Sequence, residues 1–358
     1  MKKKVLVAMS GGVDSAVAAL ILKNEGYDVQ GATMKLFDNE RIGVDYDSSC
    51  CSLEDITDAK TAALRMDMPH HVFSFARSFH ENVIDRFARS YENGETPNPC
   101  IDCNRYVKFP LMLQRAELLG ADYLATGHYA RVERDENSGR YLLKKAKHAE
   151  KDQTYVLYDL KQHQLEKTLF PLGALSKLET RARAEKFGLL SVAQKPDSQD
   201  ICFVRNGDYA GFISNATRAE PKPGVIVDKR GNELGRHNGV IGYTIGQRKG
   251  LGISSDRPLY VISKDALSAT IVVGEESDLY SESLTAGDVN FISIDKLETP
   301  MEVTAKTRYS QAEAPAVITP VGEREVSVRF RKPQRAVTPG QAVVFYDGDA
   351  VVGGGVIR

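Results

Sequence analysis

Short apolar runs alternate with amphipathic stretches through the first half of the chain. Four of the runs have the composition of strands: Lys4–Met9, Asp28–Leu36, His70–Phe75 and Asp122–Tyr129. Four other stretches place apolar residues at helical spacing: Asp14–Glu25, Ser52–Met66, Ser78–Asn93 and Arg105–Leu119. Strands separated by helices predict an α/β fold with a doubly wound parallel sheet, in which ligands bind beyond the carboxyl ends of the strands.

The segment that follows departs from this alternation. Tyr129–Lys147 predicts a hairpin that turns at Asn137–Gly139, and two further helices are expected over Lys151–Leu169 and Ser176–Phe187. Neither helix belongs to a strand–helix repeat. We therefore expect the parallel-sheet domain to carry a helical extension.

After Pro221 the helical pattern disappears, and short strands with Gly and Asp turns replace it. A turn is expected at Lys229–Asn232, and Leu259–Ile262 is expected to pair with Ala269–Val273. Later strands, including Val326–Phe330, predict a small Greek-key barrel. The expected domains are a catalytic domain with its extension over 1–205, a β-rich central domain over 206–280 and a C-terminal β-barrel over 281–358.

Composition narrows the class of protein. The chain has 358 residues, 42% of them hydrophobic and 27% charged, which is typical of a globular protein of two or three domains. The formal net charge of −1 gives no overall basic field, so a nucleic-acid partner has to meet a local patch. Five cysteines, an odd number, and the absence of a long apolar run predict a cytoplasmic protein with no membrane partner.

The first strand runs into a Gly-containing turn and then a helix. Paired glycines at Gly11 and Gly12 let the backbone approach an anion, and a helix start offers amides to a phosphate. Asp14 could hold a metal ion or the helix start. No lysine follows the glycines, which excludes the Gly-Lys-Ser/Thr nucleotide loop. Ser-Gly-Gly-x-Asp-Ser instead resembles the loop of pyrophosphatase-type ATP enzymes, although a plain capped turn is the alternative.

Cysteines mark a second candidate site. Thr96–Asn104 contains two prolines as well as Cys100 and Cys103, and predicts a rigid loop that presents both thiols. The Cys-x-x-Cys spacing suits a metal, a redox pair or a cluster. Adjacent Cys50 and Cys51 are poor ligands for a tetrahedral ion, so no structural zinc site is expected. We interpret that pair as the packed start of a helix.

Six motifs occur in an order that resembles the tRNA-specific 2-thiouridylase family, and they span nearly the whole chain. They are Ser-Gly-Gly-Val-Asp-Ser from Ser10, Thr-Pro-Asn-Pro-Cys-Ile-Asp-Cys-Asn from Thr96, Ala-Thr-Gly-His-Tyr-Ala from Ala125, Lys-Asp-Gln-Thr-Tyr from Lys151, Asp-Ser-Gln-Asp-Ile-Cys-Phe from Asp197 and Gly-Tyr-Thr-Ile-Gly-Gln-Arg-Lys-Gly-Leu from Gly242. That family replaces the 2-oxygen of the wobble uridine with sulfur. The fold implied is adenine-nucleotide α-hydrolase-like.

The resemblance implies an ATP step and the residues for it. The uracil 2-oxygen is a poor leaving group, so it would first be adenylated, with Mg²⁺ neutralising the departing pyrophosphate. The implied ATP-binding residues are Ala8, Met9, Ser10, Gly11, Gly12, Val13, Asp14, Ser15, Met34 and Gly127. From spacing alone, Met34 would be read as a core residue.

Sulfur transfer and tRNA binding are implied in the same way. Cys202 would carry a persulfide, and Cys103 would attack it to leave a Cys103–Cys202 disulfide. Asn98, Pro99 and Cys100 match the target-base loop. The implied tRNA-contact residues are His128, Lys151, Asp152, Gln153, Arg308, Tyr309 and Gln341. Expected partners are glutamate, glutamine and lysine tRNAs and a persulfide donor such as a cysteine desulfurase or a relay protein.

One position departs from the family pattern. Many members have Asp where this chain has Cys100, and that Asp is credited with proton transfer, so this role is left unassigned here. The third cysteine also opens an alternative, in which Cys100, Cys103 and Cys202 bind a [4Fe–4S] cluster whose fourth iron holds sulfide.

Two rival functions come from other classes. An ATP-dependent ligase or amidotransferase for a small molecule would share only the opening loop. The cysteine pair speaks against it, and so do basic residues of the expected barrel such as Lys306 and Arg329. A non-catalytic RNA-binding module is disfavoured by the intact loop at Ser10–Ser15 and by Cys202.

Overall fold

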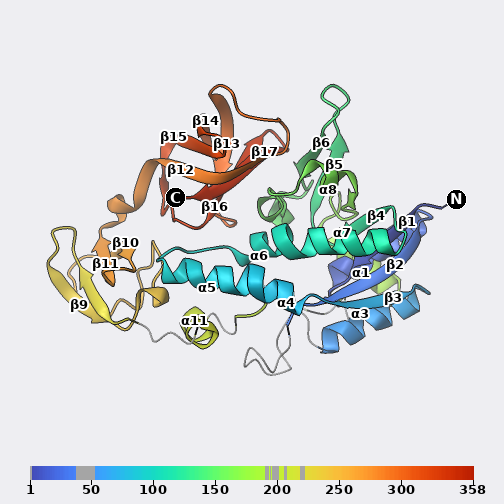
Figure 1. Cartoon of the computed structure of the whole chain (residues 1–358), viewed down its shortest axis with the longest axis horizontal. Coiled ribbons are helices and arrows are strands. Elements are labelled where there is room, and N and C mark those ends of the chain that lie inside the picture. The colour runs from blue at the N-terminus through green and yellow to red at the C-terminus, as the bar shows by residue number, and fades with distance from the viewer. Residues whose placement is uncertain are drawn as a thin grey trace. The chain divides into compact units, whose positions relative to one another are not determined.

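The chain forms two compact units, each assembled from separate segments. The computed structural model describes residues 2–37, 53–189, 193, 195, 201–204, 208–217 and 222–358 (Figure 1). The first unit comprises Met1–Val83, Cys100–Arg205 and Asp349–Val351. The second comprises Ile84–Pro99, Asn206–Gly348 and Val352–Arg358. Cys50, Cys51 and the expected helix start at Ser52 lie outside the described residues.

A five-stranded sheet forms the centre of the first unit. Its order is β3-β2-β1-β4-β7, and every pairing in it is parallel. The strands are β1 (Lys4–Ala8), β2 (Asp28–Lys35), β3 (His70–Ser74), β4 (Tyr123–Thr126) and β7 (Thr168–Leu169). Successive strands move outward from β1 to β3 and then return to β4 on its other side. The junction of β1 and β4 is therefore the switch point where such sheets bind ligands.

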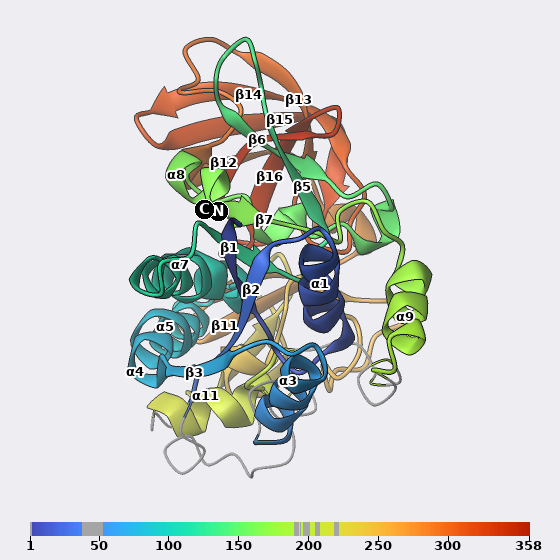
Figure 2. The same cartoon turned by 90° about the vertical axis from the view of Figure 1, so that its right-hand side faces the viewer.

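Helices cover both faces of this sheet, as the alternation of elements predicted (Figure 2). Helices α1 (Val13–Asn24) and α3 (Leu53–Arg65) lie on one face, and α7 (Phe109–Leu118) lies on the other. Val5 and Val7 pack into the core shared with α1 and α3, while Leu6 between them points to the opposite face and is also fully buried. Helix α9 (Lys177–Lys186) lies beside α1.

The segment after β4 corrects one expectation. Strands β5 (Ala130–Arg134) and β6 (Tyr141–Lys145) form the predicted hairpin, but the helix expected over Lys151–Leu169 is wrong. In its place are 3₁₀ turns at Ala149–Lys151 and Thr154–Val156, the short helix α8 (Gln162–Glu166) and β7, which joins the sheet.

A polar side chain explains the difference. The carboxylate of Asp152 accepts hydrogen bonds from the amide of Ala146 at 3.0 Å and the hydroxyl of Thr154 at 2.6 Å. These bonds fix a turn where helical periodicity suggested continuation. The extension is therefore less helical than expected, although α9 begins as predicted, with Ser176 as its N-cap and Glu179 completing a capping box.

The cysteine segment corrects a second expectation. Residues from Pro99 onward are helical, with α6 (Pro99–Asp102) followed by a π-helical turn at Cys103–Lys108 that continues into α7. Proline suits a first helical position, because its fixed φ is helical and its missing N–H has no partner to lose there. Pro99 therefore starts a helix, whereas Thr96–Asn98 remain in a loop.

The helix expected over Ser78–Asn93 is present but interrupted. It consists of α4 (Ala76–Phe79), a π-helical turn at His80–Ile84 and α5 (Asp85–Glu92). In the second unit, α5 packs against α11 (Tyr209–Thr217), with ring centroids 6.4 Å apart for Phe87 and Phe212.

A four-stranded sheet in the second unit has the order β10-β11-β8-β9. Its strands are β8 (Gly224–Val227), β9 (Glu233–His237), β10 (Tyr260–Asp265) and β11 (Thr270–Gly274). The antiparallel pairs β8–β9 and β10–β11 confirm the turn at Lys229–Asn232 and the expected pairing of the other two segments.

The C-terminal strands close into a six-stranded barrel over residues 280–358, all of which are described. Its strands are β12 (Tyr280–Phe291), β13 (Met301–Lys306), β14 (Ala314–Gly322), β15 (Glu325–Arg335), β16 (Ala342–Asp347) and β17 (Ala350–Ile357). β12 pairs with both β15 and β17, which closes the barrel. The adjacent order β16-β13-β14-β15 is a Greek key. No helix in the described parts of the chain is long and apolar enough to cross a membrane.

Candidate functional site

The loop after β1 is shaped by a glycine that no other residue could replace without strain. Gly11 has φ +73°, and a Cβ built on it would lie 2.4 Å from the backbone oxygen of Asp55 in α3. The hydroxyl of Ser15 braces the loop, because it accepts from the amide of Ser10 and donates to the carbonyl of Gly12, both at 3.1 Å.

The start of α1 is open to an anion. Gly12 is the N-cap residue, and no side chain there accepts a hydrogen bond from the first turn. Asp14 does not cap the helix, so of the two roles expected for it the capping role is absent. Amides at an uncapped helix start, together with the positive end of the helix dipole, favour a phosphate.

Two further ATP-site candidates lie at the same edge of the sheet. Gly127 follows β4, and a Cβ there would lie 2.7 Å from the amide nitrogen of Ser15. Met34 is half-buried near the carboxyl end of β2, next to β1. The fold thus brings the loop at Ala8–Ser15, Met34 and Gly127 together around the switch point.

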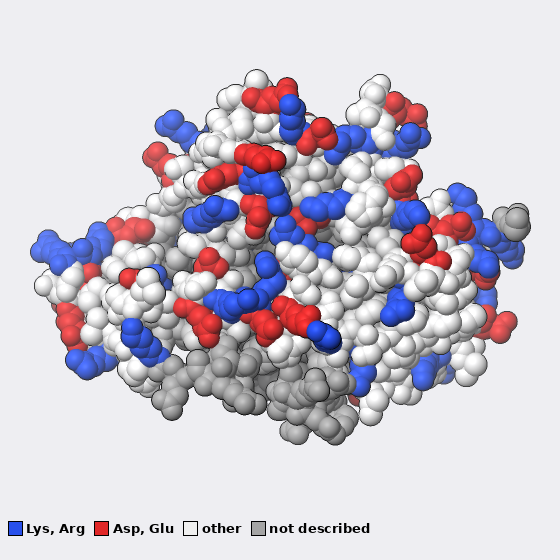
Figure 3. Space-filling model, viewed as in Figure 1, with Lys and Arg blue, Asp and Glu red and all other residues white. Residues whose placement is uncertain are grey.

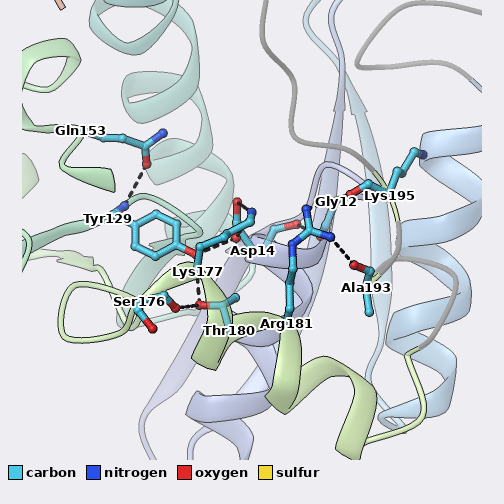
Figure 4. A network of polar contacts seen from close by, with 11 residues as sticks. Gly12, Asp14, Tyr129, Gln153, Ser176, Lys177, Thr180, Arg181, Ala193 and Lys195 are labelled. Carbon is cyan, nitrogen blue, oxygen red and sulfur yellow. Dashed lines mark hydrogen bonds and ion pairs between the residues drawn. The ribbon is translucent and has the colours of Figure 1, made fainter. Parts of the chain in front are cut away.

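Asp14 is the centre of a polar network at this edge (Figure 4). The ammonium of Lys177 lies 2.8 Å from each carboxylate oxygen of Asp14, and the hydroxyl of Tyr129 donates to one of them at 2.8 Å. The Tyr129 hydroxyl also lies 3.0 Å from the hydroxyl of Thr180 in α9. Sequence reasoning missed Lys177 and Tyr129, which are separated from Asp14 by more than a hundred residues.

Cys103 begins the π-helical turn and is held by its neighbours. The side-chain amide of Asn104 donates to the carbonyl of Val156 at 2.9 Å. Arg105 pairs with Asp159 at 2.8 Å, and both side chains are largely buried. The turn is therefore fixed to the segment that follows the hairpin, while the Cys103 thiol stays half-buried and the Cys100 thiol is exposed.

Cys202 lies in a turn next to an anchored aromatic ring. The amide of Val204 donates to the carbonyl of Ile201 at 3.0 Å, and buried Phe203 packs edge-on against Phe79 of α4 at 5.7 Å between centroids. Helix α4 also packs against the π-helical turn that begins with Cys103. Both cysteine segments therefore contact the same short helix.

An iron–sulfur cluster on the described residues stays a prediction. Three cysteines would have to converge on one point, and no group of three Cys, His, Asp or Glu side chains among these residues could hold a metal ion. Cys100, Cys103 and Cys202 are all described, and none of them is in a disulfide.

Basic side chains hold the backbone that leads to Cys202. Lys195 bridges Asp55 at 2.7 Å and Asp58 at 2.9 Å, both in α3. Arg181 of α9 donates to the carbonyls of Ala193 at 2.6 Å and Lys195 at 3.2 Å (Figure 4). The sequence carried no signal for these contacts.

The imidazole ring of His128 is neutral and packs between two aromatic rings. It stacks on Phe109 at 6.0 Å and meets Phe170 edge-on at 6.1 Å. Burial, reinforced by the charge of Lys108, lowers the pKa of His128 well below its usual value. Its Nε2 lies 3.5 Å from Lys108 and its Nδ1 lies 2.7 Å from Thr126, so the unprotonated nitrogen is best assigned as Nε2.

The side chains of Asp152 and Gln153, which are expected tRNA contacts, accept hydrogen bonds from backbone amides of the first unit. Asp152 forms the turn described above, and the side-chain oxygen of Gln153 accepts from the amide of Tyr129 at 2.9 Å. Lys151 ends the preceding 3₁₀ turn and is half-buried.

In the second unit, Arg308 forms hydrogen bonds with the Gly242–Leu251 motif and with the segment after β15. Its guanidinium donates to the carbonyls of Ile245 and Ala336 and to the hydroxyl of Thr338. Lys264 donates to the carbonyl of Tyr243 at 2.8 Å, and burial lowers the pKa of this lysine to about 8. Both ends of the Tyr243–Ile245 backbone are therefore held by buried or half-buried cations.

The side chain of Tyr309 is exposed, whereas that of Gln341 is half-buried. Tyr309 is 44% exposed, with the ammonium of Lys306 5.5 Å from its ring centroid, which suits stacking on a base. Gln341 donates to the carbonyl of Thr96 at 2.7 Å, just before half-buried Asn98 and buried Pro99. Figure 3 shows Lys and Arg interspersed with Asp and Glu on the visible face, in keeping with the balanced charge.

Family models match three parts of the chain. They are described as a tRNA methyl transferase HUP domain over residues 3–206, a tRNA methyl transferase PRC-barrel domain over 211–275 and an aminomethyltransferase beta-barrel domain over 281–357.

Curated relatives match the whole chain. A tRNA-specific 2-thiouridylase from Acetivibrio thermocellus is 54% identical over 100% of this chain and 99% of its own length. Those of Caldicellulosiruptor saccharolyticus and Clostridioides difficile are 53% and 50% identical over 100% of this chain and 99% of their lengths. With this identity, the opening loop at the switch point and the two cysteine segments on α4, the chain belongs to the tRNA-specific 2-thiouridylase family.

Proposed function

We propose that the chain catalyses ATP-dependent 2-thiolation of the wobble uridine of tRNA. One observation carries this conclusion: the glycine loop at the switch point and the segments of Cys103 and Cys202 occur in the same unit, with both cysteine segments on α4. An ATP loop alone would fit many reactions. Two cysteine segments in the same unit support sulfur transfer onto an activated carbon, with one thiol as nucleophile and the other as sulfur carrier.

The first step activates the uridine. Backbone amides at Gly11–Ser15 would bind the ATP phosphates, with Met34 and Gly127 against the adenosine, and the uracil 2-oxygen would attack the α-phosphate. The β–γ pyrophosphate leaves, and the 2-oxygen is left joined to AMP. When bound, Mg²⁺ would supply positive charge to the phosphates, and the Asp14 carboxylate would hold it.

The second step delivers sulfur. A donor such as a cysteine desulfurase or a relay protein loads Cys202 as a persulfide. The Cys103 thiolate attacks the inner sulfur, the sulfur–sulfur bond of the persulfide breaks, and hydrosulfide leaves as a Cys103–Cys202 disulfide forms. Hydrosulfide adds to C2 of the activated uridine, AMP departs and a C2=S bond remains. A two-electron thiol reductant then reopens the disulfide.

The proposed site residues fall into two groups, one for the target base and one for the rest of the tRNA. Asn98, Pro99 and Cys100 receive the target base, and tRNA contacts come from His128, Lys151, Asp152, Gln153, Arg308, Tyr309 and Gln341.

We infer domains over 1–205, 206–280 and 281–358, the last binding tRNA. Acceptors are glutamate, glutamine and lysine tRNAs, which share the modified wobble position, and the reaction takes place in the cytoplasm.

The descriptions of two matched domains name methyl transfer, whereas the relatives' names specify thiolation. The residues favour thiolation, because methyl transfer needs neither an ATP-splitting loop nor a pair of thiols. A small-molecule ligase stays the second candidate only through the shared ATP loop.

A mercury gel tests the proposal directly. Anaerobically purified protein, unmodified glutamate tRNA, ATP, Mg²⁺ and a persulfide source should give a retarded tRNA band that depends on ATP. Cys103→Ser and Cys202→Ser should abolish the band, and Cys202→Ser should also remove the added sulfur atom from the mass spectrum of the loaded protein. The control is Cys51→Ser, because no role in the reaction is proposed for that cysteine. No band with any sulfur source, despite bound tRNA, would favour the ligase alternative.

A further inference from the structure

The ATP loop contains no lysine, yet the structure places one on it. The ammonium of Lys177, 163 residues along the chain from Asp14, lies 2.8 Å from both oxygens of that carboxylate (Figure 4). Nucleotide loops of the Gly-Lys-Ser/Thr type carry a phosphate-binding lysine within the loop itself. Here the corresponding charge would come from a different helix.

The position of Lys177 is unfavourable for helix stability. It is the first residue of α9, directly after the N-cap residue Ser176. A cation there is repelled by the positive end of the helix dipole, which favours acidic residues in the first turn. The capping box of Ser176 and Glu179 already stabilises this end of the helix, so the lysine is not needed to start it.

The surroundings of Lys177 keep its charge directed at the loop. Its side chain is 14% exposed, so the ammonium depends on a partner in the protein. The hydroxyl of Tyr129, whose side chain is almost fully buried, holds the same carboxylate at 2.8 Å without adding charge. Asp14 would therefore stay oriented if Lys177 moved away.

We propose that Lys177 is the phosphate-binding lysine of the ATP site. Without nucleotide its ammonium neutralises Asp14. When ATP binds, the ammonium moves to the β- and γ-phosphates, and Asp14 becomes available to the magnesium ion that accompanies them. The exchange breaks one ion pair and forms another, with no covalent change. This inference rests on the ATP site proposed above.

Nucleotide binding distinguishes a phosphate ligand from a structural ion pair. Affinities of ATP and AMP, both with Mg²⁺, are measured by calorimetry for the full chain. Lys177→Met should weaken the affinity for ATP by about ten-fold or more, as expected for the loss of a charge-assisted hydrogen bond. The affinity for AMP should be unchanged, because AMP has no β- or γ-phosphate. Lys186→Met removes an exposed lysine from the same helix and should change neither affinity.

A double variant keeps the test valid if the single variant is unstable. Lys177→Met leaves Asp14 without its cation, and Asp14→Asn/Lys177→Met removes both charges while Tyr129 can still bond the amide. The double variant should unfold near the wild-type temperature and still bind ATP weakly. ATP affinity restored to the Asp14→Asn level would overturn the inference, because Lys177 would then only neutralise Asp14.

Two other results have a clear meaning. Equal weakening of ATP and AMP by Lys177→Met overturns the role of Lys177 while leaving the ATP site intact, and so does an unchanged affinity for ATP. If the wild-type chain itself binds neither nucleotide, the proposed ATP site fails before Lys177 is tested.

Discussion

At the scale of single residues, two adjacent glycines are expected to differ sharply in their tolerance of a side chain. Gly11→Ala would force Cβ against the Asp55 backbone at a positive φ, whereas the nearest atom to a Cβ on Gly12 is the Ser10 hydroxyl at 3.6 Å. We expect Gly11→Ala to lower the free energy of unfolding by about 1–3 kcal/mol. Gly12→Ala should cost much less. Urea denaturation of both variants measures this, and equal losses would contradict it.

The buried pair of Arg105 and Asp159 should support the reactivity of Cys103. Arg105→Met leaves the Asp159 carboxylate with less compensation in a buried site, and the loss should be about 3 kcal/mol in unfolding free energy. The π-helical turn should loosen as well, so alkylation of Cys103 by iodoacetamide should change in rate. The exposed pair of Arg77 and Glu81 is the control, and Arg77→Met should cost no more than about 1 kcal/mol.

His70 gives a prediction for the pH dependence of stability. Burial, together with the charges of Lys60 and His71, lowers the pKa of His70 from 6.5 to about 4. Between these two pH values the unfolded chain therefore binds a proton at His70 that the folded chain does not bind. The contribution of neutral His70 to the free energy of unfolding is present above pH 6.5 and is lost as pH falls toward 4. Chemical denaturation at several pH values should show a shallower slope for His70→Gln, and an identical slope would contradict the assignment.

At the scale of elements, the loop before β16 should hold the segment that leads to the target-base residues. The amide of Thr96 donates to the carbonyl of Pro339 at 2.9 Å, and Gln341 donates back to the carbonyl of Thr96 at 2.7 Å. Gln341→Ala should therefore speed amide hydrogen exchange over residues 94–98. Tyr309→Ala, on an exposed part of the same unit, should leave this exchange unchanged and weaken tRNA binding instead. Unchanged exchange in Gln341→Ala would argue for a direct tRNA contact alone.

Elements with strong local signals could be predicted from the sequence. The parallel sheet followed from strands alternating with helices, and the hairpins followed from Gly and Asp turns between apolar runs. The stretch over 151–169 was predicted wrongly because its fold depends on Asp152 bonding outside its own segment. Pro99 was interpreted as a helix breaker, although the same residue is suited to a helix start.

The candidate site was predictable only in part, for a related reason. The residues within one motif, such as Ser10–Ser15 or the segment around Cys103, are neighbours in the sequence. The motifs and their order along the chain could therefore be compared with those of a family. Lys177 and Lys195 act on carboxylates more than a hundred residues away, and no local pattern marks such pairs.

At the scale of the whole molecule, the two units exchange segments of chain. Ile84–Pro99 from the first half belongs to the second unit, and Asp349–Val351 belongs to the first. A fragment over residues 1–205 would therefore leave buried Phe87 and Tyr91 without Tyr209 and Phe212. We expect this fragment to bind a hydrophobic dye and to unfold without a sharp transition. A fragment with the cooperativity of the full chain would contradict this.

The same exchange has a consequence during translation. The apolar side of α5 leaves the ribosome well before the aromatic rings of α11, because more than a hundred residues separate Phe87 from Tyr209. At synthesis rates of about 5–20 residues per second, that side waits on the order of ten seconds for its partner. Nascent chains paused in this interval should therefore be the ones that chaperones capture.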